Sequence, residues 1–352
     1  MVHRMTSQNT PENRYARQRQ FAPIGVEGQR RIESAGVAVL GCGALGTVAA
    51  EILTRAGVGR LKLIDRDVVE WTNLQRQSLF VEDDAIQGVS KADVARRRLH
   101  RINSSIDLSA EVIDVTADNI DGTLDGMDLV IDACDNFSLR LLLNDWSLQT
   151  RTAWVHGGCV GAAGQVRLFD GQGTPCFRCL VSEVPPPGAV QTCDTAGVVG
   201  AATHAIASLQ AGEAIKWLSG NRDAVRRSVL SLDFWQNRIR EITISETLSK
   251  TCRACHDRQY DFLEGRKEAA DQTFALCGRD SVQVAGMGNV RLDLQAIARR
   301  WPGVGAVQET AFFIRLHFDE TTSLTLFRDG RAVIAGTQQI SEARSLYDRY
   351  VG

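Results

Sequence analysis

The sequence predicts an α/β protein with a Rossmann-like, mostly parallel sheet, an antiparallel extension, a structural zinc site and a small α+β C-terminal domain. Three observations lead to this prediction. The apolar run Val37–Leu40 is followed by the glycine-rich turn Gly41–Gly46 and by an apolar helical pattern over 44–56. Two CxxC pairs lie far apart along the chain, and the composition changes after the second pair.

The glycine turn indicates a phosphate site. Glycines permit a sharp bend and let backbone N–H groups approach a phosphate at the N-terminus of the following helix. Gly57 is expected to end this helix, and Arg60–Ile64 is the next predicted strand. Asp65 follows at its carboxyl end, where a carboxylate can accept hydrogen bonds from ribose hydroxyls. These features alone also fit an NAD dehydrogenase.

Later residues favour a nucleotide whose phosphate is attacked. Leu129–Asp132 is a further predicted parallel strand, so Asp135 reaches the same sheet edge, where its oxygens suit Mg²⁺. Arg76 and Lys91 supply the cations that developing phosphate charge requires. Ordinary solvated charges are the alternative for both. Asp67 is a further candidate at the site, and Asp132 is either a site residue or a strand cap.

The cysteine pairs predict a closed metal site. Cys176 with Cys179 and Cys252 with Cys255 offer four thiolates, the set that structural Zn²⁺ binds as a tetrahedron. A redox-active pair is the alternative, but the sequence lacks a thioredoxin-like context. The separation between the pairs is longer than in a small zinc ribbon, so we expect the site to pin the far end of a domain rather than to organise an independent finger.

The remaining predicted elements set the domain boundaries. Residues 1–13 are expected to be disordered, and 15–33 to form a helical lead-in. After strand 153–156 the sheet is expected to become antiparallel, with strand 165–169, a buried helix over 197–218 and two short strands within 229–244. We therefore expect a nucleotide-binding domain that includes the four-cysteine site over 14–256, a linker over 257–272 and an α+β domain over 273–352. Asp329-Gly330 predicts a hairpin in the last of these.

Composition narrows the cellular context. The 352 residues are 44% hydrophobic and carry a formal net charge of -2, which gives no reason to expect a nucleic-acid or membrane partner. No apolar run is long enough to span a bilayer, and the polar N-terminus lacks a secretory signal. Nine cysteines fit reduced thiols and a metal site, so we expect a cytoplasmic protein.

Several motifs in one order resemble the ThiF/MoeB/HesA family, the bacterial relatives of ubiquitin-activating enzymes. They are Arg14–Gln18, the glycine turn, Asp65–Asp67, Asn73–Gln77, Lys91, Asp132–Asn136 and both cysteine pairs, so the resemblance covers about 14–255. It implies an ATP- and Mg²⁺-dependent adenylyltransferase. The implied substrate is the C-terminal Gly-Gly carboxylate of a ubiquitin-like sulfur carrier of the ThiS or MoaD type, and pyrophosphate is released. The implied pathways are thiamin, molybdopterin or related cofactor synthesis, with a cysteine desulfurase as a possible sulfur donor.

The same resemblance implies roles for individual residues. The turn glycines Gly41, Gly43 and Gly46 would lie under the phosphates. Asp65 would contact the ribose, with Asp67 beside it. Asn73, Arg76 and Lys91 would bind the phosphates, and Asp135 would bind magnesium. Arg17 would reach into the ATP site of a neighbouring subunit, which requires a homodimer.

The five other cysteines carry different expectations. Cys42 and Cys134 lie in the glycine turn and beside a strand end, and we expect them to be packing residues, as small buried thiols usually are. No role is assigned to Cys159 and Cys277. Cys193 follows the proline-rich stretch 185–187 in an expected mobile loop. In some members of the resembled family a cysteine at this loop position attacks the acyl-adenylate or takes part in persulfide chemistry. The alternatives for Cys193 are a covalent role and an incidental loop thiol.

Other functions remain open at this point. One alternative keeps adenylation but uses a peptide or a tRNA base as the substrate, and the lack of a basic patch argues against tRNA. Another is a non-catalytic, zinc-bearing docking subunit, which the complete set of Arg76, Lys91 and Asp135 disfavours. The small C-terminal domain contains no recognisable catalytic constellation.

Overall fold

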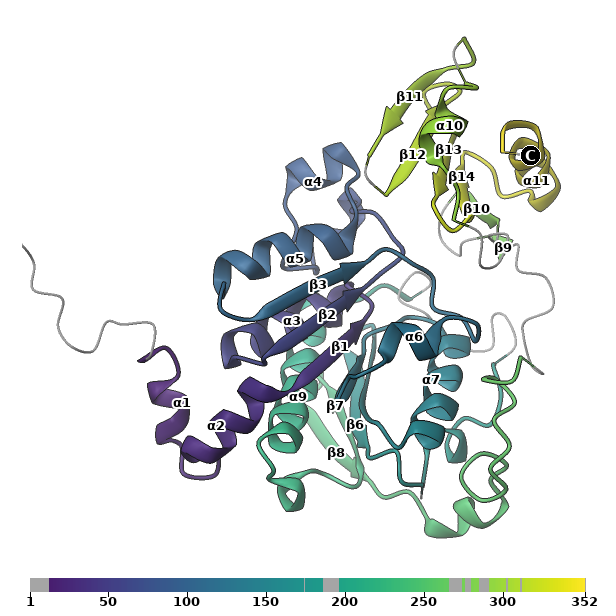
Figure 1. Cartoon of the computed structure of the whole chain (residues 1–352). Coiled ribbons are helices and arrows are strands. Elements are labelled where there is room, and N and C mark those ends of the chain that lie inside the picture. The colour runs from purple at the N-terminus through teal and green to yellow at the C-terminus, as the bar shows by residue number, and fades with distance from the viewer. Residues whose placement is uncertain are drawn as a thin grey trace, which may run out of the picture. The chain divides into compact units, whose positions relative to one another are not determined.

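The computed structural model describes residues 13–173, 175–185, 196–265, 274–275, 280–284, 291–301, 303–310 and 312–351 (Figure 1). The chain divides into two compact units, Met1–Glu264 and Gly265–Gly352. Each unit contains a sheet of its own.

The first unit is built on an eight-stranded sheet in the order β3-β2-β1-β4-β5-β6-β7-β8. Strands β3 to β5 of this order are parallel, and β5 to β8 are antiparallel. The strand bounds are β1 (Gly36–Leu40), β2 (Arg60–Ile64), β3 (Asp107–Glu111), β4 (Leu129–Asp132), β5 (Ala153–Val160), β6 (Ala163–Phe169), β7 (Val229–Asp233) and β8 (Arg238–Ile242).

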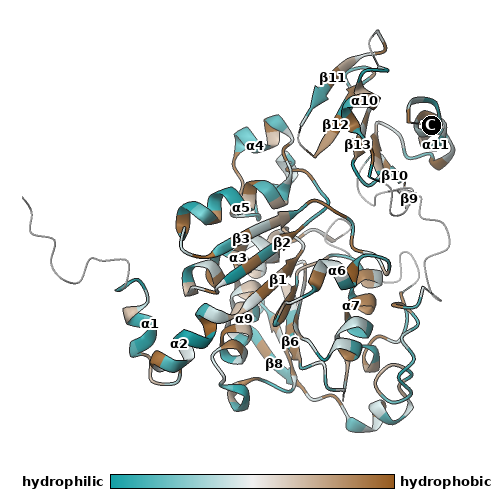
Figure 2. Cartoon of the chain, viewed as in Figure 1, coloured by the Kyte–Doolittle hydropathy of each residue, from teal (hydrophilic) through white to brown (hydrophobic). Residues whose placement is uncertain are grey.

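Helices cover both faces of the parallel strands because those strands are apolar on both sides. In β1, Val37 and Val39 join the core formed with α3, α5 and α9, whereas Ala38 and Leu40 join the core formed with α6 and α7. Figure 2 shows the contrast between the hydrophobic strand β1 and the hydrophilic outer side of α5. The helix bounds are α3 (Ala44–Ala56), α4 (Glu82–Gln87), α5 (Lys91–Ile102), α6 (Ile120–Leu124), α7 (Phe137–Thr150) and α9 (Gly200–Leu218).

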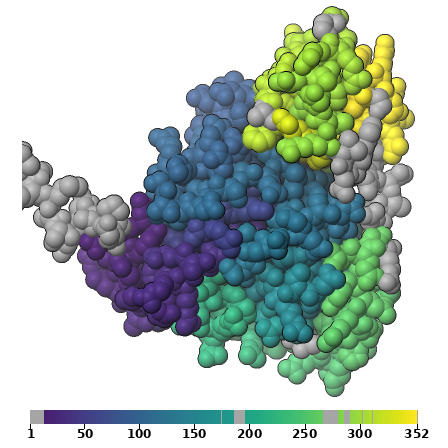
Figure 3. Space-filling model, viewed as in Figure 1, coloured from purple at the N-terminus to yellow at the C-terminus, as the bar shows by residue number. Residues whose placement is uncertain are grey.

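Two N-terminal helices, α1 (Ala16–Gln20) and α2 (Gly25–Ser34), lie at the surface of the first unit, where Figure 3 shows them in purple. They are fixed at the amino ends of the strands. Gln18 donates from Nε2 to the carbonyl of Ala56, the last residue of α3, at 3.0 Å. Asn221, just beyond α9, donates from Nδ2 to the carbonyl of Pro23 at 2.7 Å. This edge is opposite the one that carries the glycine turn.

The second unit has a six-stranded sheet in the order β11-β12-β13-β14-β10-β9. Residues from its strands, α10 and α11 form a separate hydrophobic core. The predicted hairpin at Asp329-Gly330 is confirmed, since β13 and β14 pair antiparallel across it. The bounds are β9 (Phe274–Ala275), β10 (Ser281–Val284), α10 (Leu294–Ala298), β11 (Ala306–Glu309), β12 (Phe313–His317), β13 (Ser323–Phe327), β14 (Ala332–Ala335) and α11 (Ile340–Tyr350).

The predicted fold class is confirmed: a mostly parallel sheet with an antiparallel extension, followed by a separate α+β unit. The expected disorder before Asn13 lies outside the described residues. Within the described ranges, no helix combines the length and apolar character that a membrane span requires.

Candidate nucleotide site and metal centre

The glycine turn joins β1 to α3, and two of its glycines are required by the backbone. Gly41 has φ 92°, and a Cβ there would lie 2.6 Å from the Ala133 carbonyl oxygen. A Cβ on Gly46 would lie 1.8 Å from the Gly41 carbonyl oxygen. Gly43, by contrast, faces open space, since a Cβ there would have only the Gln77 amide nitrogen near it, at 4.0 Å. The open side of the turn is therefore where a ligand can approach the N-terminus of α3.

Asp65, at the end of β2, holds the turn in place. Its Oδ2 accepts a hydrogen bond from the Cys42 backbone N–H at 2.6 Å, and its Oδ1 accepts one from the Asp67 N–H at 2.7 Å. Burial raises the pKa of Asp65, and the nearby Lys91 ammonium opposes that rise. Each carboxylate oxygen keeps a second lone pair, which leaves acceptor capacity for ribose hydroxyls.

Lys91 is a buried cation at the start of α5. Its backbone N–H donates to the Asp67 carbonyl at 3.0 Å, and its Nζ lies 3.2 Å from Asp67 Oδ2. Only 4% of Lys91 is exposed, so its charge is poorly screened by water. Arg66 lies 2.9 Å from Asp114 Oδ2 and 3.9 Å from Asp67 Oδ1. A chain of alternating charges thus runs along this edge of the sheet.

The segment that contains Asn73 and Arg76 begins with a short 3-10 helix, η2 (Trp71–Asn73). Asn73 is buried, and its Oδ1 accepts a hydrogen bond from the Glu70 N–H at 3.0 Å. Arg76 Nη1 donates to the Thr72 carbonyl at 2.7 Å. Gln77 had no predicted role, yet this side chain is buried beside the turn and its Oε1 lacks a hydrogen-bond partner. A buried acceptor without a partner fits a place prepared for a donor from a ligand.

Asp135 lies in the loop between β4 and α7, and it is exposed. It acts on Arg66 electrostatically: burial lowers the pKa of Arg66, but Asp114, Asp67 and Asp135 together raise it above its usual range. The Asp135 carboxylate thus lies close to the charges around Asp67 while remaining open to water. An accessible carboxylate beside the glycine turn is the kind of oxygen ligand that suits Mg²⁺.

The side chain of Asp132 fixes this loop through a set of buried hydrogen bonds. Its Oδ2 accepts hydrogen bonds from Arg140 Nε at 2.8 Å and His156 Nδ1 at 2.7 Å, and its Oδ1 accepts from the Cys134 thiol at 2.7 Å. Arg140 also donates from Nη2 to the Cys134 carbonyl at 2.7 Å. Asp132 is therefore neither a simple strand cap nor open to a ligand, since it is fully buried in a network that shapes the loop.

The ionisation of this network follows from its contacts. Burial alone would raise the pKa of Asp132, but Arg140 and the hydrogen bonds from His156 and Cys134 outweigh it and hold the pKa at about 2. Burial, reinforced by Arg140, lowers the pKa of His156. A neutral His156 must carry its proton on Nδ1, because the ionised Asp132 carboxylate can only accept.

Sheet order brings most of the predicted residues together. The carboxyl ends of β2, β1 and β4 are neighbours, so Asp65, the glycine turn and the loop carrying Asp135 meet at one edge. Arg17 is not among them. It is exposed on α1, at the far end of the 13-residue helix α3, which corresponds to about 20 Å from the turn. Cys193 and Cys277 lie outside the described residues.

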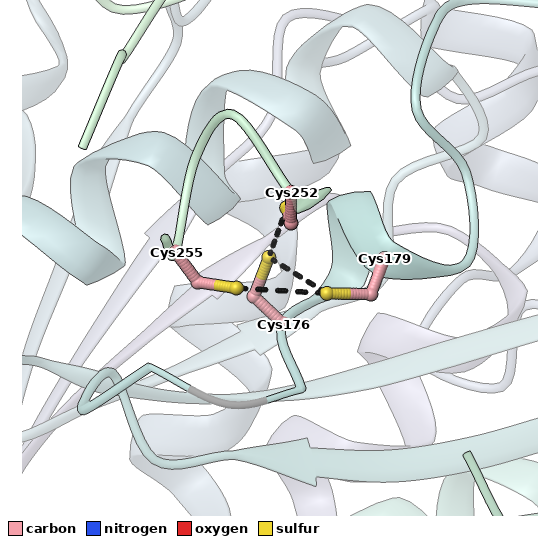
Figure 4. A group of neighbouring side chains, drawn as sticks. All are labelled: Cys176, Cys179, Cys252 and Cys255. Atoms are coloured by element: carbon pink, nitrogen blue, oxygen red, sulfur yellow. Dashed lines mark hydrogen bonds between the residues drawn. The ribbon is translucent and has the colours of Figure 1, made fainter. Parts of the chain in front are cut away.

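The four cysteines of the two CxxC pairs converge on one point (Figure 4). Their sulfur atoms all lie within 4.8 Å of one another. The Sγ–Sγ distances are 3.9 Å for Cys176–Cys179, 3.7 Å for Cys176–Cys252 and 3.6 Å for Cys179–Cys255. A tetrahedron with Zn–S bonds of about 2.3 Å has edges of about 3.8 Å, whereas a disulfide needs about 2 Å. The sulfur positions fit a tetrahedral metal site.

Polar side chains of α7 hold both cysteine pairs, and the sequence analysis did not identify them. Asn144 Oδ1 accepts a hydrogen bond from the Phe177 N–H at 2.9 Å. Arg178 donates to Asp145 at 3.1 Å and to Asp261 at 2.9 Å. Asp145 also accepts from the Phe262 N–H at 3.1 Å. These contacts link the cysteine segments 176–179 and 252–262 to α7.

The sequence of the chain is similar to those of several known proteins. The ThiF family matches residues 15–254. The chain is 40% identical to the sulfur carrier protein ThiS adenylyltransferase of Bacillus subtilis, over 96% of this chain and 99% of the relative. It is 37% identical to a sulfur carrier protein adenylyltransferase of Thermus thermophilus, over 70% of this chain and 91% of the relative.

Other relatives match a smaller share of the chain. The adenylyltransferase and sulfurtransferase MOCS3 of Anopheles gambiae is 37% identical to this chain. The matched region covers 69% of this chain and 55% of that relative. The crystal structure of E. coli MccB with ATP superposes with a TM-score of 0.60 at 25% identity, over 70% of this chain and 75% of MccB.

Proposed function

The chain belongs to the ThiF family, and from this premise we propose that it adenylates the C-terminal Gly-Gly carboxylate of a ThiS-type sulfur carrier. One observation carries the proposal. The glycine turn, the Lys91–Asp67 pair and the Asp135 loop meet at one sheet edge, in a chain that matches a ThiS adenylyltransferase along nearly its whole length.

The proposed step is a substitution at the α-phosphorus of ATP. A carboxylate oxygen of the carrier forms a bond to this phosphorus, and the bond from it to the bridging oxygen of the β-phosphate breaks. The electron pair leaves with pyrophosphate, and the product is an acyl-adenylate. No oxidation occurs and no proton has to be transferred, so positioning and charge neutralisation are the main tasks of the protein.

The residues divide these tasks among them. The open face of Gly43 admits the phosphates to the N-terminus of α3, and Asp65 takes the ribose hydroxyls. Arg76 and the buried Lys91 would neutralise the phosphate oxygens, with Asp67 orienting Lys91, and the Asn73 amide would donate a hydrogen bond to them. Asp135 would hold Mg²⁺, which supplies further positive charge to the leaving pyrophosphate. The Gln77 Oε1, which has no hydrogen-bond partner within the protein, would accept a hydrogen bond from the nucleotide.

Further parts of the proposal concern assembly and sulfur. Zinc at the four cysteines would be structural, since all four ligands come from the protein and no position is left open. Arg17, far from the turn of its own chain, would complete the ATP site of a second copy in a homodimer. Sulfur would come from a donor such as a cysteine desulfurase, after the carrier has been activated.

The test is to incubate the protein with ATP, Mg²⁺ and a small β-grasp carrier ending in Gly-Gly, and to measure the intact mass of the carrier. We expect addition of one AMP to the full-length carrier and none to a carrier that lacks the final glycine. Asp135→Asn should reduce the rate by about 10²-fold or more, because it removes the charge that holds the metal. Modification of both carriers, or of neither, would contradict the proposal, and modification of a short peptide instead would favour the peptide alternative.

The two roles considered for Cys193 are separated by Cys193→Ala. If adenylation persists while sulfur transfer to the carrier stops, the thiol forms a covalent intermediate. If both activities persist, Cys193 is incidental.

A further inference from the structure

We propose that Arg167 is the internal counter-charge of the metal-loaded cysteine cluster, and that it retains the metal without contacting it as a ligand. This inference rests on the proposed structural zinc, and its test distinguishes failure of the zinc from failure of the role of Arg167.

Arg167 is a buried guanidinium with unmet hydrogen-bonding capacity. It lies on β6 with only 6% of its surface exposed. Nη2 donates to the Pro175 carbonyl at 3.2 Å, but Nε and Nη1 have no hydrogen-bond partner. Its plane lies against the Phe169 ring, 4.7 Å from the ring centre. Among the residues that the structure describes, no carboxylate forms an ion pair with it. A buried charge in this condition is costly unless an opposite charge lies nearby.

The cysteine cluster can provide that opposite charge. Pro175, whose carbonyl accepts the hydrogen bond from the Arg167 side chain, directly precedes Cys176 of the cluster. Cys176 and Cys252 are almost fully buried. A divalent ion with four thiolates carries a net charge of about -2, so the loaded centre also needs compensation inside the protein.

The electrostatics link the two groups. Burial lowers the pKa of Arg167, while Asp170 and the thiols Cys179 and Cys176 act in the opposite direction. Asp170 is exposed, so water weakens its influence.

The other arginines in the buried surroundings of the cysteine cluster already form ion pairs with carboxylates. Arg178 forms ion pairs with Asp145 and Asp261, and Arg253 forms one with Asp261. Two cations and two carboxylates thus balance within that group. Lys250 and Arg258 are exposed to solvent. Among the described residues near the cysteine cluster, Arg167 is the buried cation that remains for the thiolates.

This arrangement predicts opposite effects in the two metal states. In the loaded protein, Arg167→Met leaves the charge of the centre uncompensated, and we expect release of the metal to a chelator to become about ten-fold faster or more. In the metal-free protein with protonated thiols, Arg167 is itself the uncompensated charge, so Arg167→Met should raise the melting temperature. Arg167→Lys keeps the charge and should stay close to the wild type in both measurements.

Gln165→Met is the matched control, because Gln165 lies two residues away on the same strand and the same face of β6 but carries no charge. It should leave metal release unchanged. If Arg167→Met releases metal at the wild-type rate, or if it destabilises both metal states alike, Arg167 is an ordinary packing residue and the proposal is wrong. If Arg167→Met fails to fold, wild-type release kinetics in Arg167→Lys support the proposal, and accelerated release in that variant contradicts it. If the wild-type chain neither carries metal nor takes it up, the proposed zinc centre itself is wrong.

Discussion

At the scale of single residues, the shape of the candidate site depends on buried polar side chains that are closed to a ligand. Asp132 was predicted as a site residue or a strand cap, but it is the buried centre of a network with Arg140, His156 and Cys134. This network fixes the backbone of the loop that presents Asp135. Sequence spacing indicated that Asp132 lies at the sheet edge, but its partners come from other elements, so its role needed the tertiary structure.

The lowered pKa of His156 gives a pH dependence that can be measured. The unfolded chain protonates this residue near pH 6.5, whereas the folded protein does so only at lower pH, because burial and Arg140 disfavour the cation. The stability contribution of neutral His156 is thus complete above about pH 6.5 and is lost as the pH falls below that value.

We therefore expect the melting temperature of the first unit to fall between pH 7.5 and pH 5, with a smaller slope in His156→Gln. Equal slopes in the wild type and in His156→Gln would show that His156 does not titrate differently on folding. Asp132 does not contribute in this range, since its folded pKa of about 2 and its unfolded value both lie below it.

At the scale of elements, the strand-turn-helix unit was predictable and the anchoring of the cysteines was not. Val37–Leu40 is apolar throughout and glycines follow it, so β1, its turn and α3 could be placed from the sequence. Strand β3 was not predicted, because its sequence Asp107–Glu111 is largely polar at the edge of the parallel strands. Helix α7 was also missed, since most of its circumference is buried and it lacks a clear polar face.

The glycine turn provides a matched pair of variants. Gly46→Ala places a methyl group against the Gly41 carbonyl, so we expect a loss of about 3 kcal/mol of folding free energy. Gly43→Ala meets no close protein atom and should change stability by less than about 1 kcal/mol. Denaturant melts measure the first difference, and ATP titrations should show weakened binding in Gly43→Ala as well. Unchanged ATP affinity in Gly43→Ala would mean that the phosphates lie elsewhere.

The cysteine cluster makes a prediction for the elements that it links. Cys252→Ser removes one of four ligands, and we expect the bound metal to fall from one ion per chain towards none. The free energy of unfolding should fall by about 4 kcal/mol or more, as is usual when a structural metal is lost. Metal analysis and thermal melts measure both effects. Cys159→Ser, at a buried cysteine outside the cluster, should retain the metal. Full metal occupancy in Cys252→Ser would exclude the four-thiolate site.

At the scale of the whole molecule, two compact units share one chain, and the described candidate site residues fall in the first. The first unit matches the ThiF family, whereas the likeness to the Bacillus subtilis relative extends over nearly the whole chain. The second unit is therefore a feature that this chain shares with a ThiS adenylyltransferase. Its separate core and sheet were foreseeable from the strand pattern, but its role was not, because no chemical motif marks it.

The position of Arg17 predicts that two chains build each ATP site. Arg17→Ala and Asp135→Ala should each be inactive alone. An equimolar mixture that has exchanged subunits should recover about a quarter of wild-type activity, since half of the dimers are mixed and each mixed dimer has one complete site. Activity is measured after dissociation and reassociation, with unmixed samples as controls. Failure to recover, with mixed dimers demonstrated, would place Arg17 outside the partner's site.

The most direct test of the proposed function is the exchange of labelled pyrophosphate into ATP by the full chain. Adenylation is reversible, so exchange should occur only when Mg²⁺ and a Gly-Gly carrier are both present, and Asp135→Asn should suppress it. A carrier truncated by its final glycine should support none. Exchange at the same rate without any carrier, or no exchange with any Gly-Gly carrier from the same genome, would contradict carrier adenylation as the reaction of this site.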